Sequence, residues 1–140
     1  MKTIFAIDWI LSGVFLLSVV SGFLFHAAGH DGSHEQWHDM AVFHVLTSLL
    51  FLIVAILHLI THRGWYKSVA HKGFGRKSKV TAVLTVIFLV TVVTGFVLLG
   101  VDGANTETGL WHYRSGIVLV LISVGHVFKR IPLLRKSFVR

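Results

Sequence analysis

Residues 40–61 read MAVFHVLTSLLFLIVAILHLIT, a run that contains no Asp, Glu, Lys or Arg. A helix needs about 20 consecutive apolar residues to cross the hydrocarbon core of a bilayer. His44 and His58 are the only ionisable residues in this run. The run therefore predicts a transmembrane helix that carries two imidazoles.

Three further stretches match the first in length and apolar character. They are residues 4–25, residues 80–100 and residues 110–128. Asp8 is the only charge in the first of them and Arg114 the only one in the last. Hydrophobic residues make up 54% of the chain and charged residues 14%, whereas soluble domains are about a quarter charged. We therefore expect a single all-α domain over residues 1–140, built as a four-helix transmembrane up-and-down bundle.

The composition also excludes several classes of protein. A chain so apolar is a poor fit to a soluble enzyme or a nucleic-acid-binding domain. The absence of cysteine excludes disulfides, zinc–thiolate sites and iron–sulfur clusters. The segments between the spans are polar and rich in glycine and predict loops: AAGHDGSHEQWHD, HRGWYKSVAHKGFGRKSK and VDGANTETG. In the first of these, a helix starting near Ser33 is also compatible with the sequence.

The basic residues indicate an orientation. If the four spans alternate in direction, twelve of the thirteen Lys and Arg residues lie on one side and only Arg114 lies on the other. Five of the six acids lie on the side of Arg114. Because Lys and Arg accumulate in cytoplasmic loops, we expect both termini in the cytoplasm and an integral protein of a prokaryotic cytoplasmic membrane. The net charge of +7 then reflects the loops and not a nucleic-acid-binding face.

Two segments hint at an internal duplication. The first span ends in SGFLF (residues 21–25) and the third ends in TGFVL (residues 94–98). Each is followed by a short loop, a tryptophan and a span with histidines.

The histidines of the second and fourth spans have matching positions. His44 and His58 are fourteen residues apart, and so are His112 and His126. Fourteen residues of helix rise ~21 Å and turn to within ~40° of four full turns, so each span presents two imidazoles on one face near opposite membrane surfaces. The second and fourth helices of an up-and-down bundle are parallel, which matches His44 with His112 and His58 with His126 in depth.

Two facing imidazoles across a bundle core suit the two axial positions of a haem iron. We therefore predict two b-type haems, one ligated by His44 and His112 and one by His58 and His126. With both axial positions filled, such a haem carries electrons and has no site for oxygen or substrate. Arg114 is a possible partner of a haem propionate. Gly13, Gly22 and Gly95 on the other two spans are candidates to make room for the cofactor.

Other interpretations remain open at several histidines. His62 lies one turn after His58 and is an alternative ligand, although the matched spacing favours His58. Four more histidines recur every fourth residue before the second span: His26, His30, His34 and His38. They would form a ladder on a helix, but Gly29 and Gly32 favour a solvated loop over a divalent-metal site or a proton- or quinone-facing cluster.

These residues resemble a known family. The segment HEQWHDMAVFHVLTSLLFLIVAILHLITHRGW (residues 34–65) is similar to the flavinylation-associated cytochromes, small four-helix relatives of the di-haem cytochrome b subunits of formate dehydrogenases and hydrogenases. The last span, LWHYRSGIVLVLISVGHVFKR, is similar to theirs. In the family the histidine follows the tryptophan more closely than His44 follows Trp37. This leaves His38, or a shifted register, as an alternative to His44 for the haem on the extracytoplasmic side.

The resemblance implies electron exchange between membrane quinones and extracytoplasmic partners, often flavin-bearing proteins. We expect an electron-transfer subunit and not a complete enzyme with catalytic residues of its own. A component of a quinone or quinol oxidoreductase fits this expectation. Membrane lipid and a quinone are the expected partners, with an extracytoplasmic redox protein and self-association as further options. The alternative is a histidine-based metal-ion or proton transporter, which would favour mid-membrane carboxylates and broken helices.

Overall fold

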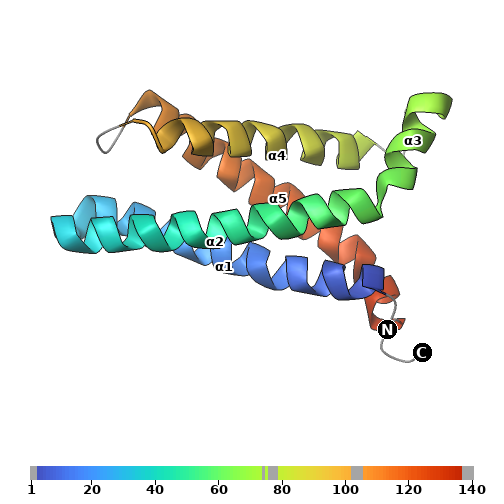
Figure 1. The fold of residues 1–140 in the computed structure, drawn as a ribbon, viewed down its shortest axis with the longest axis horizontal. Helices are drawn as coiled ribbons and strands as arrows, with labels where there is room; N and C mark the ends of the chain where they lie inside the picture. The colour runs from blue at the N-terminus through green and yellow to red at the C-terminus, as the bar shows by residue number, and fades with distance from the viewer. Residues whose placement is uncertain (1–2, 74, 76–78, 102–105, 137–140) are drawn as a thin grey trace. The chain divides into compact units, whose positions relative to one another are not determined.

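The computed structural model describes residues 3–73, 75, 79–101 and 106–136, and all regular structure within them is helical (Figure 1). These residues form five helices: α1 (Thr3–Asp31), α2 (His34–Thr61), α3 (Arg63–Lys72), α4 (Lys79–Leu98) and α5 (Glu107–Lys136). Four of them, all except α3, are long and apolar enough to cross a membrane. The prediction of an all-α chain with four helices able to span a membrane is confirmed, whereas the up-and-down bundle and the side on which the termini lie stay predictions.

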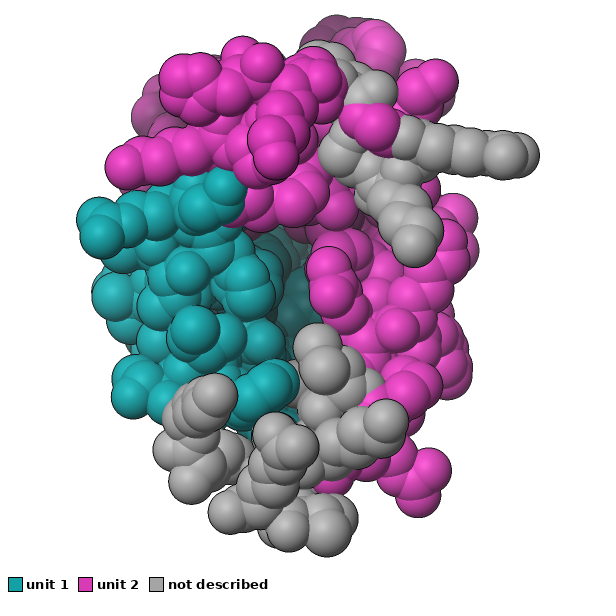
Figure 2. All heavy atoms as spheres, turned by 90° about the vertical axis from the view of Figure 1, so that its right-hand side faces the viewer, with its two compact units in different colours: residues 1–64, 136–140 teal, residues 65–135 magenta. Residues whose placement is uncertain are grey.

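The chain divides into two compact units, which Figure 2 shows in different colours. Unit 1 comprises residues 1–64 with 136–140, and unit 2 comprises residues 65–135. Unit 1 contains α1 and α2, and unit 2 contains α4 and almost all of α5. Each unit is therefore built on one pair of long helices.

A two-residue turn joins α1 to α2 and makes them antiparallel neighbours (Figure 1). The N–H of Gly32 donates to the carbonyl of Ala28 at 3.0 Å, and a Cβ at Gly32 would lie 2.6 Å from that oxygen. Ser33 then starts α2 with a capping box: its Oγ accepts from the N–H of Gln36, whose side chain accepts from the N–H of Ser33. The turn is short because both helix ends satisfy their own backbone groups.

Two of the three predicted loops are wrong over much of their length. α1 continues through the histidines to Asp31, and α2 begins at His34 as the alternative interpretation allowed. Gly29 lies inside α1, where a glycine costs only about 1 kcal/mol and does not end a long helix. The second predicted loop contains α3, which ends at Lys72 and is followed by Gly73 with a φ of +75°, the left-handed conformation that glycine adopts most easily. Of the third predicted loop, residues 102–105 lie outside the described residues.

Hydroxyl groups connect the elements of unit 2. Thr91 Oγ1 on α4 donates to Ser115 Oγ on α5 at 3.1 Å. Six residues earlier on α4, Thr85 Oγ1 lies 3.1 Å from the hydroxyl of Tyr66 on α3. The middle of α4 is thus linked by hydroxyl groups to both α5 and α3.

Polar side chains are buried in this structure while large apolar ones face outward. Ser21 is fully buried, and Thr47 and Ser115 are also buried. Leu16 is 63% exposed and Leu121 is 69% exposed, both in the middle of a predicted span. This inverted distribution is expected where lipid surrounds the helices, because lipid solvates apolar side chains and interhelical hydrogen bonds need the protein interior.

A cysteine placed at Leu16 tests this assignment, and the chain has no native cysteine to interfere. In open membrane fragments, we expect Leu16→Cys to resist a hydrophilic maleimide until the membrane is dissolved in SDS. Lys67→Cys on α3, which is also exposed in the structure, should react at once. Equal rapid labelling of both variants would contradict a lipid-facing α1.

Candidate functional site

His44 of unit 1 is held by a serine on the neighbouring helix; we call His44 and His112 the outer histidines and His58 and His126 the inner ones, after the sides of the membrane that the sequence predicts for them. His44 on α2 is half-buried, and its Nδ1 lies 3.0 Å from Ser21 Oγ on α1. Ser21 Oγ also lies 2.7 Å from Thr47 Oγ1 and 2.8 Å from the carbonyl oxygen of Ser18. The fully buried hydroxyl of Ser21 is therefore the centre of a small polar network around the imidazole.

This network assigns the tautomer of His44. A hydroxyl has one proton, and Ser21 donates its proton to the carbonyl of Ser18, which can only accept. The oxygen of Ser21 then accepts from Nδ1–H of His44. In that tautomer the ring lone pair is on Nε2, which makes Nε2 the nitrogen that a metal would bind.

The outer histidine of unit 2 has the same arrangement. His112 Nδ1 on α5 lies 3.0 Å from Thr94 Oγ1 on α4. Thr94 Oγ1 lies 2.8 Å from the carbonyl of Val90 and 3.1 Å from that of Thr91, so its single proton is directed to these carbonyls and its oxygen is placed to accept from Nδ1–H of His112. Both outer histidines thus carry their lone pair on Nε2, for the same physical reason.

A glycine beside each hydroxyl makes room for the imidazole. A Cβ on Gly22 would lie 3.0 Å from Cε1 of His44, and a Cβ on Gly95 would lie 3.1 Å from Cε1 of His112. Both distances are tighter than ordinary carbon contacts. The structure therefore gives these two glycines a more specific role than space for a cofactor: they admit the histidine rings. A Cβ on Gly13, the third glycine, would have nothing within 4 Å.

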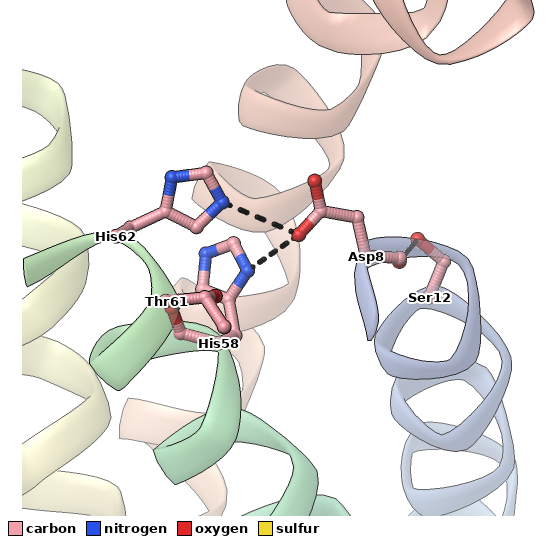
Figure 3. A network of polar contacts seen from close by, with 5 residues as sticks. All are labelled: Asp8, Ser12, His58, Thr61 and His62. Atoms are coloured by element: carbon pink, nitrogen blue, oxygen red, sulfur yellow. Dashed lines mark hydrogen bonds and ion pairs between the residues drawn. The ribbon is translucent and has the colours of Figure 1, made fainter. Parts of the chain in front are cut away.

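The inner histidine of unit 1 is held by a carboxylate (Figure 3). His58 Nδ1 lies 2.8 Å from Asp8 Oδ1, and His62 Nε2 lies 3.4 Å from the same oxygen. A carboxylate only accepts, so His58 donates Nδ1–H and carries its lone pair on Nε2. Asp8 is mostly buried, with 18% of its side chain exposed. His58 therefore has the same ligand-ready tautomer as the outer histidines, with a charged partner in place of a hydroxyl.

The contacts of Asp8 also separate the two possible inner ligands of unit 1. His62 turns Nε2 toward Asp8, and this nitrogen is buried without a hydrogen bond of standard geometry. His58 turns Nδ1 to the carboxylate instead, so that Nε2 is directed elsewhere. The two imidazoles thus differ in which nitrogen faces Asp8, and the choice of His58 over His62 as the ligand stays a prediction from the spacing.

The remaining predicted residues lie on α5 and on the ends of α1 and α2. His126 is half-buried on α5. Arg114 is exposed, and its guanidinium carbon lies 6.0 Å from the centre of the Trp111 ring. His44 and His58 belong to unit 1 while His112 and His126 belong to unit 2. Their pairing across the two units stays a prediction, as does the pairing of Arg114 with a propionate.

The four histidines that precede the second predicted span, residues 26, 30, 34 and 38, are not in a loop. His26 and His30 lie on α1, with ring centres 4.8 Å apart, and His34 and His38 lie on α2. All four are exposed. Among the described residues, the one group of three possible metal ligands within 4.8 Å of one another is Asp8, His58 and His62. The interpretation of these four exposed histidines as a divalent-metal site therefore has no support in this geometry.

The sequence alone missed three of the supporting residues. Asp8 stood out as the only acid within a span, but nothing connected it with His58, fifty positions away. Ser21 and Thr94 belong to the repeated motif SGF and TGF, which did mark the right places. The repeat marks the two hydroxyl residues whose oxygens face Nδ1 of His44 and His112.

Comparison of the chain with protein-family models, with curated proteins and with solved structures finds no match. The functional interpretation therefore depends on the residues themselves.

Alanine at Gly22 tests the close contact with the imidazole. The added Cβ must displace the ring of His44, so we expect Gly22→Ala to lower the free energy of unfolding by about 1–3 kcal/mol. Gly13→Ala, with open space around the new Cβ, should be neutral or stabilising by up to about 1 kcal/mol. Unfolding in SDS, followed by circular dichroism, measures both variants. Equal stability of the two would contradict the packing described here.

Proposed function

We propose that this chain is a di-haem b-type cytochrome that carries electrons across the membrane. His44 and His112 ligate the haem near the extracytoplasmic surface. His58 and His126 ligate the haem near the cytoplasmic surface. The residues resemble those of the flavinylation-associated cytochromes, and the proposal takes its expectations about partners from that resemblance.

The observation that carries the proposal is the common placement of Nδ1 in three of the four histidines. Nδ1 of His44, His58 and His112 lies 2.8–3.0 Å from an oxygen on a neighbouring helix, where Nδ1–H is placed to donate. Histidines that bind metals through Nε2 almost always donate the other ring N–H to such an acceptor, which fixes the ring and makes it a better ligand. Three histidines prepared in this way, with matching spacing on two spans, are more than packing requires.

The residues suit haem better than a small hydrated ion. Two imidazoles per iron fill both axial positions, and the bound group then supplies one-electron transfer without an open coordination site. The chain's own contribution is to hold each imidazole in one orientation and one tautomer. Apolar helices around the histidines exclude water, which favours electron transfer over side reactions.

The proposed partners come from the family resemblance and from the expected orientation of the chain. Electrons would enter from a quinone pool or a donor on the cytoplasmic side and leave to an extracytoplasmic redox protein, for which the resemblance suggests a flavin-bearing partner. A chain of 140 residues with four spans has the character of one electron-transfer subunit in such a pathway. We assign it as a carrier within a quinone oxidoreductase system.

Haem content tests the proposal directly. Protein purified from a haem-replete host should contain two b-type haems per chain, measured by the pyridine haemochrome and the reduced-minus-oxidised spectrum. Alanine at any of the four ligands should remove one haem: His44, His58, His112 or His126. His62→Ala and the exposed control His30→Ala should keep both.

A colourless protein in the same host would overturn the proposal. A single haem in the wild type would mean that one of the two pairs is wrong. Loss of a haem in His62→Ala, with retention in His58→Ala, would move the inner ligand by one turn.

A metal-ion site is the second candidate, and the group Asp8, His58 and His62 favours it. Two imidazoles and a carboxylate are a common ligand set for zinc and iron. The distances fit less well, because two ligands of one tetrahedral zinc lie about 3.3 Å apart. The 2.8 Å between His58 Nδ1 and Asp8 Oδ1 is instead the length of a charge-assisted hydrogen bond.

Zinc binding separates the two candidates. If the chain is a cytochrome, titration of the haem-loaded protein with zinc should show no stoichiometric site that depends on His62. If the metal candidate is right, calorimetry should show one zinc per chain, and His62→Ala should weaken it at least tenfold while His30→Ala does not. Zinc binding of that kind together with absence of haem would favour the metal site.

A further inference from the structure

The two helix pairs share several hydrogen bonds and differ at one position that carries a charge. Fourteen residues before Gly22 stands Asp8, and fourteen residues before Gly95 stands Thr81. In both pairs a hydroxyl one turn later donates to the carbonyl of this residue: Ser12 to Asp8 at 2.9 Å and Thr85 to Thr81 at 2.9 Å. The backbone pattern is thus duplicated, while the carboxylate occurs in unit 1 alone.

The carboxylate gives His58 a partner unlike the hydroxyls that face His44 and His112. Asp8 Oδ1 accepts from His58 Nδ1 at 2.8 Å, whereas His44 and His112 donate to neutral hydroxyls at 3.0 Å. A carboxylate within an apolar helix is costly and is kept where it serves a function. A charged acceptor pulls the Nδ1 proton more strongly than a hydroxyl does, which raises the electron density on the ring.

We propose that Asp8 is a positioning residue that makes the haem held by His58 harder to reduce than the haem held by His44 and His112. This inference rests on the proposed function. A more electron-rich imidazole stabilises the ferric state, and hydrogen bonding to an axial ligand is one of the means by which a protein sets a haem potential. The negative charge of Asp8 acts in the same direction.

This order of potentials gives electron flow a direction. In each transfer the iron held by His58 loses one electron and is oxidised, and the iron held by His44 and His112 gains that electron and is reduced. Transfer is therefore downhill from the His58 end of the chain to the His44 end. The basic residues of the predicted cytoplasmic side would oppose this order, but they lie outside the predicted spans, where salt screens them. Asp8 acts through a direct bond to the ligand.

A redox titration of the haem-loaded full chain tests the inference. The wild type should show two one-electron steps, with the step that disappears in His58→Ala at the lower potential. Asp8→Asn keeps an oxygen acceptor and removes the charge. The equilibrium constant for reduction of the haem held by His58 should therefore rise at least tenfold, which is 59 mV for one electron. Asp8→Glu should stay close to the wild type. Thr81→Ala, the matched change in unit 2, should move neither step.

The outcomes separate this inference from the proposed function. Two haems with the His58 step at an equal or higher potential in the wild type, or unmoved in Asp8→Asn, would overturn the role of Asp8 and leave the cytochrome intact. If Asp8→Asn fails to bind haem, the inference is tested by the wild type alone: the haem held by His58 must have the lower of the two reduction potentials. A wild type without haem would overturn the cytochrome, and the inference with it.

Discussion

A hydrogen bond from an imidazole Nδ1–H to an oxygen on the next helix determines what each histidine of this chain can do. In water such a bond would contribute little, because solvent offers the same partner. Between apolar helices there is no such competitor, and an imidazole that lacks an acceptor would be costly. The acceptor therefore fixes both the ring orientation and the tautomer. At His44 and His112 the fixed tautomer leaves the lone pair on Nε2, which is where a metal binds.

The same bonds also set the register of the helix pairs. Apolar side chains gain little from packing on each other rather than on lipid, so contacts between small and polar residues carry the specificity. In unit 1, Ser21 meets both His44 and Thr47, and Gly22 touches the ring of His44. A slide of one helix by a single turn would break all three contacts. The polar network is consequently both the site and the main device that aligns α1 with α2.

The sequence predicted the spans well because bilayer thickness and apolar length are linked by simple geometry. It failed at the helix ends, since a glycine within a long helix and one that ends a helix look alike in the sequence: Gly29 lies inside α1 and Gly32 follows its end. The contact of Asp8 with His58 could not be predicted either. α1 is apolar around its whole circumference, so the sequence does not reveal which side faces α2. Spacing within one helix is periodic and predictable, whereas rotation between helices depends on packing.

The repeated helix pair explains why the difference between Asp8 and Thr81 is informative. Two copies of one helix pair would make His44 equivalent to His112 and His58 equivalent to His126, so the two ligands of each haem would be alike. Hydroxyls are kept in both copies beside His44 and His112, as Ser21 and Thr94, so those two environments remain alike. At the other end one copy has a carboxylate and the other has Thr81. Under the proposed function each haem takes one ligand from each copy, so this difference makes the two ligands of one haem unlike while those of the other stay alike. The charge of Asp8 therefore acts directly on the haem held by His58 and not on the haem held by His44 and His112.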